Sequence, residues 1–229
     1  MRPALCIVVP VLDEGDTLAA RLQALQGLRR RGARLVVVDG GSQDDTLAIA
    51  RAHADLALRA PRGRASQMNA GAAACPADVL LFLHADTTLP DDADRLVRYA
   101  TLGPFTWGRF DVRIDSPRPM LRLVSHLMNL RSRWTGIATG DQAIFVRLDL
   151  FDRVGGFPDL PLMEDIAMSR LLKRHGPPAC LPQRVVTSPR RWERHGVWRT
   201  ILLMWRLRAA YFFGADPGQL AIRYGYRPR

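Results

Sequence analysis

The chain has 229 residues, of which 48% are hydrophobic and 24% charged, a balance typical of a soluble globular protein. Its length suits one domain that buries a full core without disulfides or a structural metal. The three cysteines are scattered in no metal-binding spacing, which indicates reduced thiols and a cytoplasmic location. We expect neither a secretory leader nor a membrane-spanning helix, because no window of about 20 residues is apolar and free of charge.

The net charge of +11 comes almost entirely from arginine, since Lys173 is the only lysine. Such a charge is typical of proteins that bind nucleic acid. The arginines, however, are spread along the chain and are not interleaved with aromatic residues on one element, as base stacking would require. We therefore expect anionic small molecules or an anionic membrane surface as partners, and no nucleic acid.

In the first hundred residues, apolar runs typical of buried strands alternate with segments of helical periodicity. Strands are expected at residues 5–9, 35–38, 56–58 and 79–83, and helices at residues 16–30, 46–54 and 65–74. A further helix is expected to begin at Asp91 and Asp92. This order predicts an α/β fold with a mostly parallel, Rossmann-like sheet flanked by helices.

The second half is less regular, but no linker rich in Pro, Gly and Ser separates it from the first, which favours one domain. Strands are expected at residues 107–114 and 143–146, and helices at residues 120–130, 148–154 and 166–175.

A last helix, over residues 198–213, is apolar on both sides. One stripe is expected to pack on the domain; it consists of Trp198, Ile201, Leu202, Trp205, Ala209 and Phe212. Leu203, Met204 and Leu207 would lie on the other side, flanked by arginines. Such a helix is either buried within the fold, or contacts a membrane surface or a second copy of the chain.

Acidic residues follow three of the expected strands, at Asp13-Glu14, Asp39 and Asp86. Right-handed crossovers place these turns at one edge of the sheet, where ligands bind in open α/β folds. Asp39, followed by Gly-Gly-Ser, forms either a structural turn or a carboxylate that accepts hydrogen bonds from a base or ribose. Asp86 suits Mg²⁺ or Mn²⁺ together with substrate phosphates. His84 in such a position is more often structural, but imidazole tolerates Mn²⁺, so His84 is a second candidate metal ligand.

Three further clusters have both a structural and a functional interpretation. Arg64, directly before the expected helix that carries Asn69, indicates either a solvated helix start or an anion site for a diphosphate. Glu164 and Asp165 either cap the helix that follows them or supply a general base. The run Arg190-Arg191-Trp192 is either a surface charge cluster or a pair of diphosphate ligands beside an aromatic wall.

These segments occur in a characteristic order from residue 5 to residue 192: IVVPVLDEGDTL, VVVDGGSQDDT, RGRASQMNAG, LLFLHADTTLP, GDQAIFVRLDLFDRVGGFPDLPLMEDIAMSRLLKR and SPRRW. In this order they resemble an inverting family 2 glycosyltransferase. The HAD and MED versions further resemble a small bacterial subgroup, the radical-SAM/selenodomain-associated or arsenosugar-biosynthesis glycosyltransferases. The resemblance implies a GT-A fold over residues 1–192, a C-terminal helical extension over residues 193–229, and a nucleotide-diphosphate sugar donor.

Carried over position by position, the resemblance implies that Asp39 binds the nucleobase or ribose. The turn of Pro10, Asp13 and Glu14 would lie beneath the nucleotide, with Arg64 and Asn69 on the donor side. Arg191 and Trp192 stand where the Q-x-x-R-W signature of processive members falls. Gln183 is too far upstream to complete that signature, so processive synthesis is not implied.

For the chemistry, the resemblance implies that Asp86 is the last acid of the D-x-D motif and holds Mg²⁺ or Mn²⁺ against the diphosphate. The first acid of that motif is His84 here, a departure that leaves the metal's identity open. Asp165 would deprotonate the acceptor hydroxyl with Glu164 beside it, while Gly140 and Asp141 would orient donor and acceptor. The acceptor would attack opposite the leaving diphosphate, so that the anomeric configuration inverts.

Two other functions compete with sugar transfer. A sugar nucleotidyltransferase would share the nucleotide-binding half, but it should carry a Gly-rich loop with Arg and Lys where this chain has LDEGDTL. A non-catalytic basic module on a membrane surface or nucleic acid would tolerate replacement of Asp86 and Asp165. The acceptor and the donor's base and sugar are not specified by the sequence.

Overall fold

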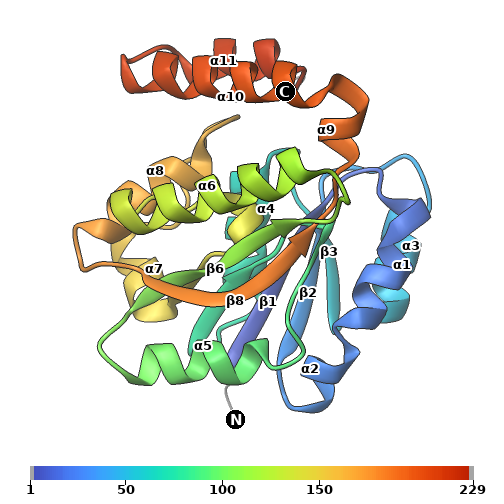
Figure 1. The fold of residues 1–229 in the computed structure, drawn as a ribbon. Coiled ribbons are helices and arrows are strands. Elements are labelled where there is room, and N and C mark those ends of the chain that lie inside the picture. Colours follow the sequence, from blue (N-terminus) through green and yellow to red (C-terminus); the bar gives the residue numbers. More distant parts are fainter. Residues whose placement is uncertain (1–2, 227–229) are drawn as a thin grey trace.

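The computed structural model describes residues 3–226; residues 1–2 and 227–229, which the expected domains include, lie outside the described part. One eight-stranded sheet runs through the molecule in the order β3-β2-β1-β4-β7-β6-β8-β5 (Figure 1). The strands are β1 (Leu5–Val11), β2 (Arg34–Asp39), β3 (Leu56–Arg59), β4 (Val79–Phe82), β5 (Thr87–Thr88), β6 (Trp107–Ile114), β7 (Phe145–Arg147) and β8 (Ala179–Thr187). β3, β2, β1 and β4 are parallel to one another, and β7 is antiparallel to β4.

Helices cover both faces of the sheet. They are α1 (Gly15–Ala24), α2 (Gln26–Arg30), α3 (Thr46–His53), α4 (Arg64–Ala74), α5 (Ala93–Leu102), α6 (Pro119–Thr135), α7 (Leu148–Val154), α8 (Glu164–Lys173), α9 (Arg190–His195), α10 (Val197–Phe212) and α11 (Pro217–Tyr224), with a 3-10 turn η1 (Gly140–Gln142). Alternate residues of the buried strands point to opposite faces, because side chains alternate along a strand. Thus Ile7 and Val9 pack with α1, α3 and α5, whereas Val8 packs with α4, α7 and α8.

The first half of the fold confirms the strands and helices expected from the apolar pattern. The expected helix over residues 16–30 is divided at Leu25 into α1 and α2. In the second half, β8, α9 and α11 are elements that the pattern did not predict. β8 contains Pro182 and the charged Arg184, and its burial does not alternate regularly, so it lacks the periodicity that identifies a half-buried strand.

The C-terminal helices pack on the start of α8. Leu207 of α10 and Leu220 of α11 share a hydrophobic cluster with Leu162, Met163 and Ile166. α10 and α11 therefore lie beyond α6 and α8 at the side of the molecule away from the N-terminus (Figure 1). Within residues 3–226, no helix has both the length and the hydropathy that crossing a bilayer requires.

The packing of α10 corrects the expected orientation of its two apolar stripes. Trp198, Leu202, Trp205 and Phe212, which were expected to face the domain, are exposed, and Leu207 on the opposite side is buried. Leu203 and Met204 also pack against the hydrophobic cluster at the start of α8. Because α10 is apolar on both sides, periodicity alone does not determine which side faces the core.

Candidate functional site

Two connected hollows form a cleft at the carboxyl ends of β1 and β4, closed from above by α9, α10 and α11. Their volumes are about 270 and 200 Å³. Both are lined by Glu14, Arg64, His84, Asp86, Leu162 and Tyr224. The larger also includes Gly140, Asp141, Glu164, Asp165, Arg191, Trp192 and Arg208, and the smaller includes Pro10 and Gln67. The expected grouping of acids and arginines at one sheet edge is thus present.

His84 and Asp86 lie in the turn that follows β4. The Nδ1 atom of His84 is 3.2 Å from a carboxylate oxygen of Asp141, and its ring lies against the backbone of Gly140. A Cβ atom at position 140 would be only 2.2 Å from Nε2 of His84, so any other residue there would require the His84 ring to shift. Burial works against the charge of Asp141, but the hydrogen bond and charge of His84 outweigh it and lower the pKa of Asp141.

Glu164 and Asp165 open helix α8 directly after Met163, whose backbone is left-handed with φ of 68°. Both oxygens of Asp165 accept backbone hydrogen bonds, from Gly140 N at 2.9 Å and from Ile166 N at 2.7 Å. These two amides fix the orientation of a carboxylate that still lines the cleft. Glu164 beside it is buried, and this desolvation, together with the charge of Asp165, raises the pKa of Glu164.

The raised pKa of Glu164 gives a stability prediction. Above its folded-state pKa, the folded protein must hold a charged Glu164 in a poor environment, whereas below the unfolded value of about 4.3 the group is protonated in both states. We expect Glu164→Gln to unfold at a higher temperature than the wild type at about pH 8, with the difference vanishing towards about pH 4. Thermal unfolding at both pH values measures this, with the exposed Glu193→Gln as control. An unchanged difference across this range would contradict it.

Arg64 is the first residue of α4 and projects into both hollows. Within residues 3–226 it forms no ion pair shorter than 4 Å. The side chain is exposed to the solvent of the cleft. The cleft walls around it disfavour its charge, but the nearby carboxylates, that of Glu164 above all, outweigh this and raise the pKa of Arg64. A guanidinium so placed is a permanent cation, free to bind an anion that enters the cleft.

The opposite wall combines an arginine with aromatic rings. The guanidinium of Arg191 lies 3.5 Å from the ring centroid of Tyr224 and donates to the backbone oxygen of Tyr224 at 3.2 Å. Partial burial, followed by repulsion from Arg64, lowers the pKa of Arg191. Trp192 lines the cleft and also packs against the hydrophobic cluster of Ile114 and Leu121. Glu14, on the β1 side, pairs with Arg190 at 3.3 Å.

Three expected donor-binding residues do not line either hollow. Asp39 is fully buried and accepts from Ser42 N at 3.0 Å, with Arg59 at 3.4 Å. Asp13 accepts from the backbone of Gln43. The side-chain amide of Asn69 donates to the carbonyl oxygen of Phe157 at 2.8 Å and accepts from the backbone nitrogen of Phe157 at 2.9 Å. These two hydrogen bonds join α4 to the loop after α7.

Sequence reasoning missed Gln67, Arg208 and Tyr224. Gln67 is buried beneath the smaller hollow and donates to the carbonyl oxygens of Val11 and Val38, which holds the ends of β1 and β2 together. Its place one turn after Arg64 could have indicated it. Arg208 and Tyr224 enter from α10 and α11, and no local pattern in the sequence indicates that these helices close the cleft.

Asp86 is suited to hold a cation only with help from a ligand. Its carboxylate lines both hollows and accepts from the hydroxyl of Thr87 at 3.3 Å. Across residues 3–226, no three Asp, Glu, His or Cys side chains are gathered closely enough to bind a metal by themselves. Mg²⁺ and Mn²⁺ are commonly bound by one or two carboxylates plus substrate phosphates. The donor set therefore fits a cation that arrives with a diphosphate.

Comparison with solved structures identifies the fold. The whole chain superposes on 66% of mannosyltransferase PcManGT from Pyrobaculum calidifontis, solved in complex with GDP-Man and Mn²⁺, with a TM-score of 0.67 and 23% identity. The chain also matches TarS 1-349 of S. aureus in complex with UDP-GlcNAc, with a TM-score of 0.63 and 16% identity over 82% of this chain and 58% of that one. The architecture is the GT-A fold, with the cleft at its usual sheet edge.

Comparison of sequences identifies the family. A PGL/p-HBAD biosynthesis glycosyltransferase of Mycobacterium bovis BCG is 30% identical over 172 residues, which cover 68% of this chain and 63% of that relative. The protein of the same description from Mycobacterium tuberculosis H37Rv matches equally well. The chain thus spans less than two thirds of the length of these relatives. The signature of Glycosyl transferase family 2 matches residues 6–157, and the chain belongs to this family.

Proposed function

We propose that the protein transfers a sugar from a nucleotide-diphosphate donor to an acceptor hydroxyl, with inversion at the anomeric carbon and with the help of Mg²⁺ or Mn²⁺. One observation carries the proposal. Asp86 after β4 and Asp165 at the start of α8 line the same hollow, with the cations Arg64 and Arg191 in its walls. A leaving diphosphate and an attacking hydroxyl need this combination of cations and a base.

The donor fits with its diphosphate between Arg64 and Arg191, because neither guanidinium pairs with a carboxylate within residues 3–226. The nucleoside then occupies the smaller hollow beside Pro10 and Glu14. Asp39 and Asn69 do not line this hollow. For Asp39 to bind the donor directly, its carboxylate would have to give up its contact with Ser42 or with Arg59. Asp86 would hold Mg²⁺ or Mn²⁺ together with the diphosphate, and the bound cation would supply neutralisation of the leaving group's charge.

The acceptor hydroxyl fits beside Asp165. As its oxygen bonds to the anomeric carbon, the bond from that carbon to the diphosphate oxygen breaks and the electron pair leaves with the diphosphate. The hydroxyl proton passes to Asp165, whose orientation is fixed by Gly140 and Ile166. We assign His84 to positioning rather than to metal binding, because its ring is engaged by Asp141 and Gly140. Attack from the side opposite the leaving group inverts the configuration.

We further propose that residues 1–192 form the transferase domain and residues 193–229 an extension, whose described part, residues 193–226, closes the cleft. The free thiols of Cys6, Cys75 and Cys180 support a reducing, cytoplasmic location, where nucleotide sugars are also available. Contact with the inner face of a membrane through residues 198–213 is compatible with that location. The narrower radical-SAM/selenodomain-associated subgroup is supported only by the HAD and MED segments.

The proposal is tested with a panel of UDP-, GDP- and dTDP-sugars in the presence and absence of Mn²⁺. We expect at least one donor to bind and to be hydrolysed slowly, with water in place of the acceptor, so that its nucleotide is released. Mn²⁺ should accelerate this hydrolysis. A second assay supplies a sugar phosphate and a nucleoside triphosphate. A sugar nucleotidyltransferase would join them into a sugar nucleotide, whereas a glycosyltransferase should release nucleotide from the donor and form no sugar nucleotide in this assay. If no donor binds or reacts while nucleic acid binds at physiological salt, the protein is a binding module and the proposal is wrong.

A further inference from the structure

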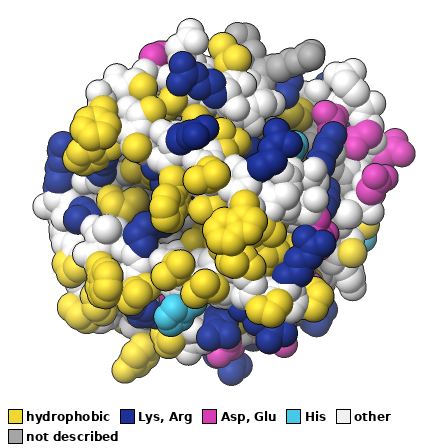
Figure 2. Space-filling model, turned by 45° about the horizontal axis from the view of Figure 1, so that its top comes forward, with side chains coloured by type: hydrophobic (Ala, Val, Ile, Leu, Met, Phe, Trp, Pro, Cys, Tyr) yellow, Lys and Arg dark blue, Asp and Glu magenta, His cyan; other side chains and the backbone are white. Residues whose placement is uncertain are grey.

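Exposed hydrophobic side chains gather on the outer side of α10 and on α6. We define this outer face by Leu123, Leu127, Trp134, Trp198, Leu202, Trp205, Phe212 and Phe213, all of which are exposed. Trp198 and Trp205 lie seven residues apart on one side of α10 and are 65% and 67% exposed. Figure 2 shows hydrophobic side chains across this side of the molecule. Exposed apolar groups in such number indicate a binding surface rather than the scattered residues of an ordinary surface.

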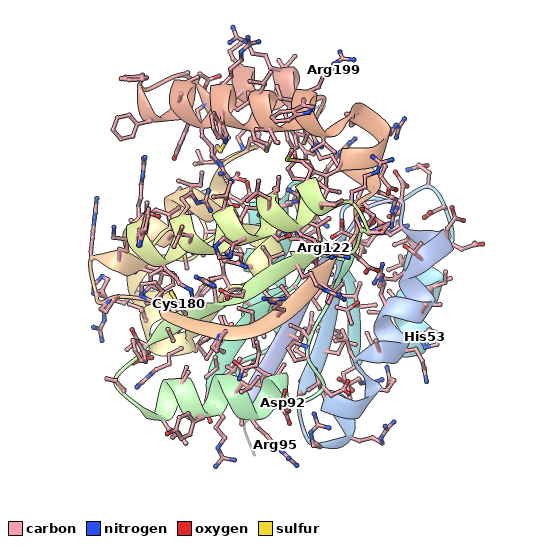
Figure 3. All side chains as sticks on the ribbon, viewed as in Figure 1. His53, Asp92, Arg95, Arg122, Cys180 and Arg199 are labelled. Carbon is pink, nitrogen blue, oxygen red and sulfur yellow. The ribbon has the colours of Figure 1, made fainter. Side chains whose placement is uncertain are left out.

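The charge of the same region is of one sign. No acidic residue lies between Asp115 and Asp141 or between Glu193 and Asp216, the stretches that contain α6 and α10. Arg122, Arg199 and Arg206 are exposed there and form no ion pair within the described chain. Arg199 extends from α10 away from the sheet (Figure 3). Figure 2 likewise shows Lys and Arg among the hydrophobic groups, with acidic side chains towards the margin.

We propose that the outer face docks on the surface of an anionic lipid bilayer, with α10 lying in the plane of the headgroups. Trp and Phe enter the boundary between headgroups and acyl chains, and arginines beside them bind lipid phosphates. The absence of acidic groups over two whole helices matches a negative surface. A second copy of the chain fits less well, because a symmetric dimer through this face would place its arginines against one another.

The surface lies directly behind the cleft. Thr200, Met204 and Arg208 on the inner side of α10 line the larger hollow, while Trp198, Leu202 and Trp205 on its outer side face away from it. One helix therefore separates the docking surface from the proposed acceptor end of the cleft. Docking holds that end close to the headgroup layer, where the hydroxyl of an amphiphilic acceptor would be presented. The docking itself does not depend on the proposed reaction.

The test uses flotation with vesicles of phosphatidylcholine alone and of phosphatidylcholine and phosphatidylglycerol in equal parts. We expect the wild type to float with the anionic vesicles, and Trp198→Ser/Trp205→Ser to reduce the partition coefficient by roughly tenfold or more. Arg199→Glu/Arg206→Glu should reduce it by a similar factor, and added salt should weaken binding of the wild type. All four positions are exposed, so both variants should fold, which circular dichroism verifies.

The matched controls lie on α5, at the opposite side of the molecule, where Figure 3 labels Arg95. Tyr99→Ser/Leu102→Ser removes two side chains that are 85% and 76% exposed, and Arg95→Glu/Arg98→Glu makes the same charge change. Both should float like the wild type. Equal losses in the control variants, or no flotation of the wild type, would overturn the proposal. A third outcome would also overturn it: the wild type forms a dimer in solution and does not bind vesicles, and Trp198→Ser/Trp205→Ser abolishes the dimer. The outer face would then be a dimer interface.

Discussion

Replacing Asp165 by Asn should reduce glycosyl transfer by about a thousandfold while leaving donor affinity within about twofold. A positioned general base typically contributes about 10²–10⁴ in rate, which corresponds to roughly 3–5 kcal/mol of the activation barrier. Asn keeps the shape of Asp165, but its single side-chain oxygen can accept from only one of the two amides, Gly140 N or Ile166 N, that Asp165 accepts from. Unchanged donor affinity therefore also checks that the loop before β7 stays in place. Turnover with a reactive donor, together with calorimetric donor binding, separates the loss of rate from a loss of binding.

Glu164→Gln is the matched variant, because the two carboxylates are adjacent and both reach the cleft. The backbone amide of the η1 turn, Gly140 N, donates to Asp165 and not to Glu164. The raised pKa of Glu164 also means that a smaller fraction of Glu164 is ionised at a given pH. We expect this variant to keep most of its turnover, with a shifted pH profile, because it removes the negative charge beside Asp165. If Glu164→Gln is inactive and Asp165→Asn is active, the two roles must be exchanged.

Replacing Asp86 by Asn should abolish the gain in nucleotide affinity that Mn²⁺ provides. Asp86 is the carboxylate at the end of β4, and across the described residues no cluster of three ligands is present to replace it. The cation should therefore bind weakly to the free protein and much more strongly when a nucleoside diphosphate is present. Turnover should fall by about a hundredfold or more, because several kcal/mol of charge stabilisation at the leaving group are lost.

Titration of UDP and GDP with and without Mn²⁺ measures this coupling, and paramagnetic resonance counts free Mn²⁺ in the absence of nucleotide. Asp91→Asn is the control, since it makes the same change of charge at an exposed position outside both hollows. Equal coupling in Asp86→Asn and in the wild type would remove Asp86 from the metal site. A control variant with reduced coupling would show that net charge alone is responsible.

The sequence pattern predicts the first half of the fold well because each element there is locally determined. Apolar runs such as residues 79–83 are buried on both faces, so their strand character is visible without knowledge of their partners. β8 is different, since Pro182 and Arg184 are tolerated only through its pairing with β6 and a register shift at Phe110 and Asp111. The outward orientation of Trp198 on α10 likewise depends on tertiary contacts.

The candidate site follows the same division. Asp86 and Arg64 were placed correctly near one another because they follow parallel strands, whose carboxyl ends meet by topology. Asp39 and Asn69 share that edge, yet their side chains form hydrogen bonds with Ser42 and Phe157. The pattern of residue types cannot reveal such partners. Tyr224 and Arg208 come from helices whose position is set by packing on Leu162 and Met163. Their contribution is visible only in the folded chain.

The packing of α10 and α11 against the start of α8 has a consequence for the family as a whole. The family signature ends at residue 157, whereas the acid pair follows at residues 164–165. The residues on either side of that pair, Met163 and Ile166, are held by Leu207 and Leu220. A relative with the same motif letters but a different C-terminal segment would therefore set the acid pair, which includes the proposed base, at another depth and angle in the cleft. Acceptor preference can diverge in this way while every motif residue stays unchanged.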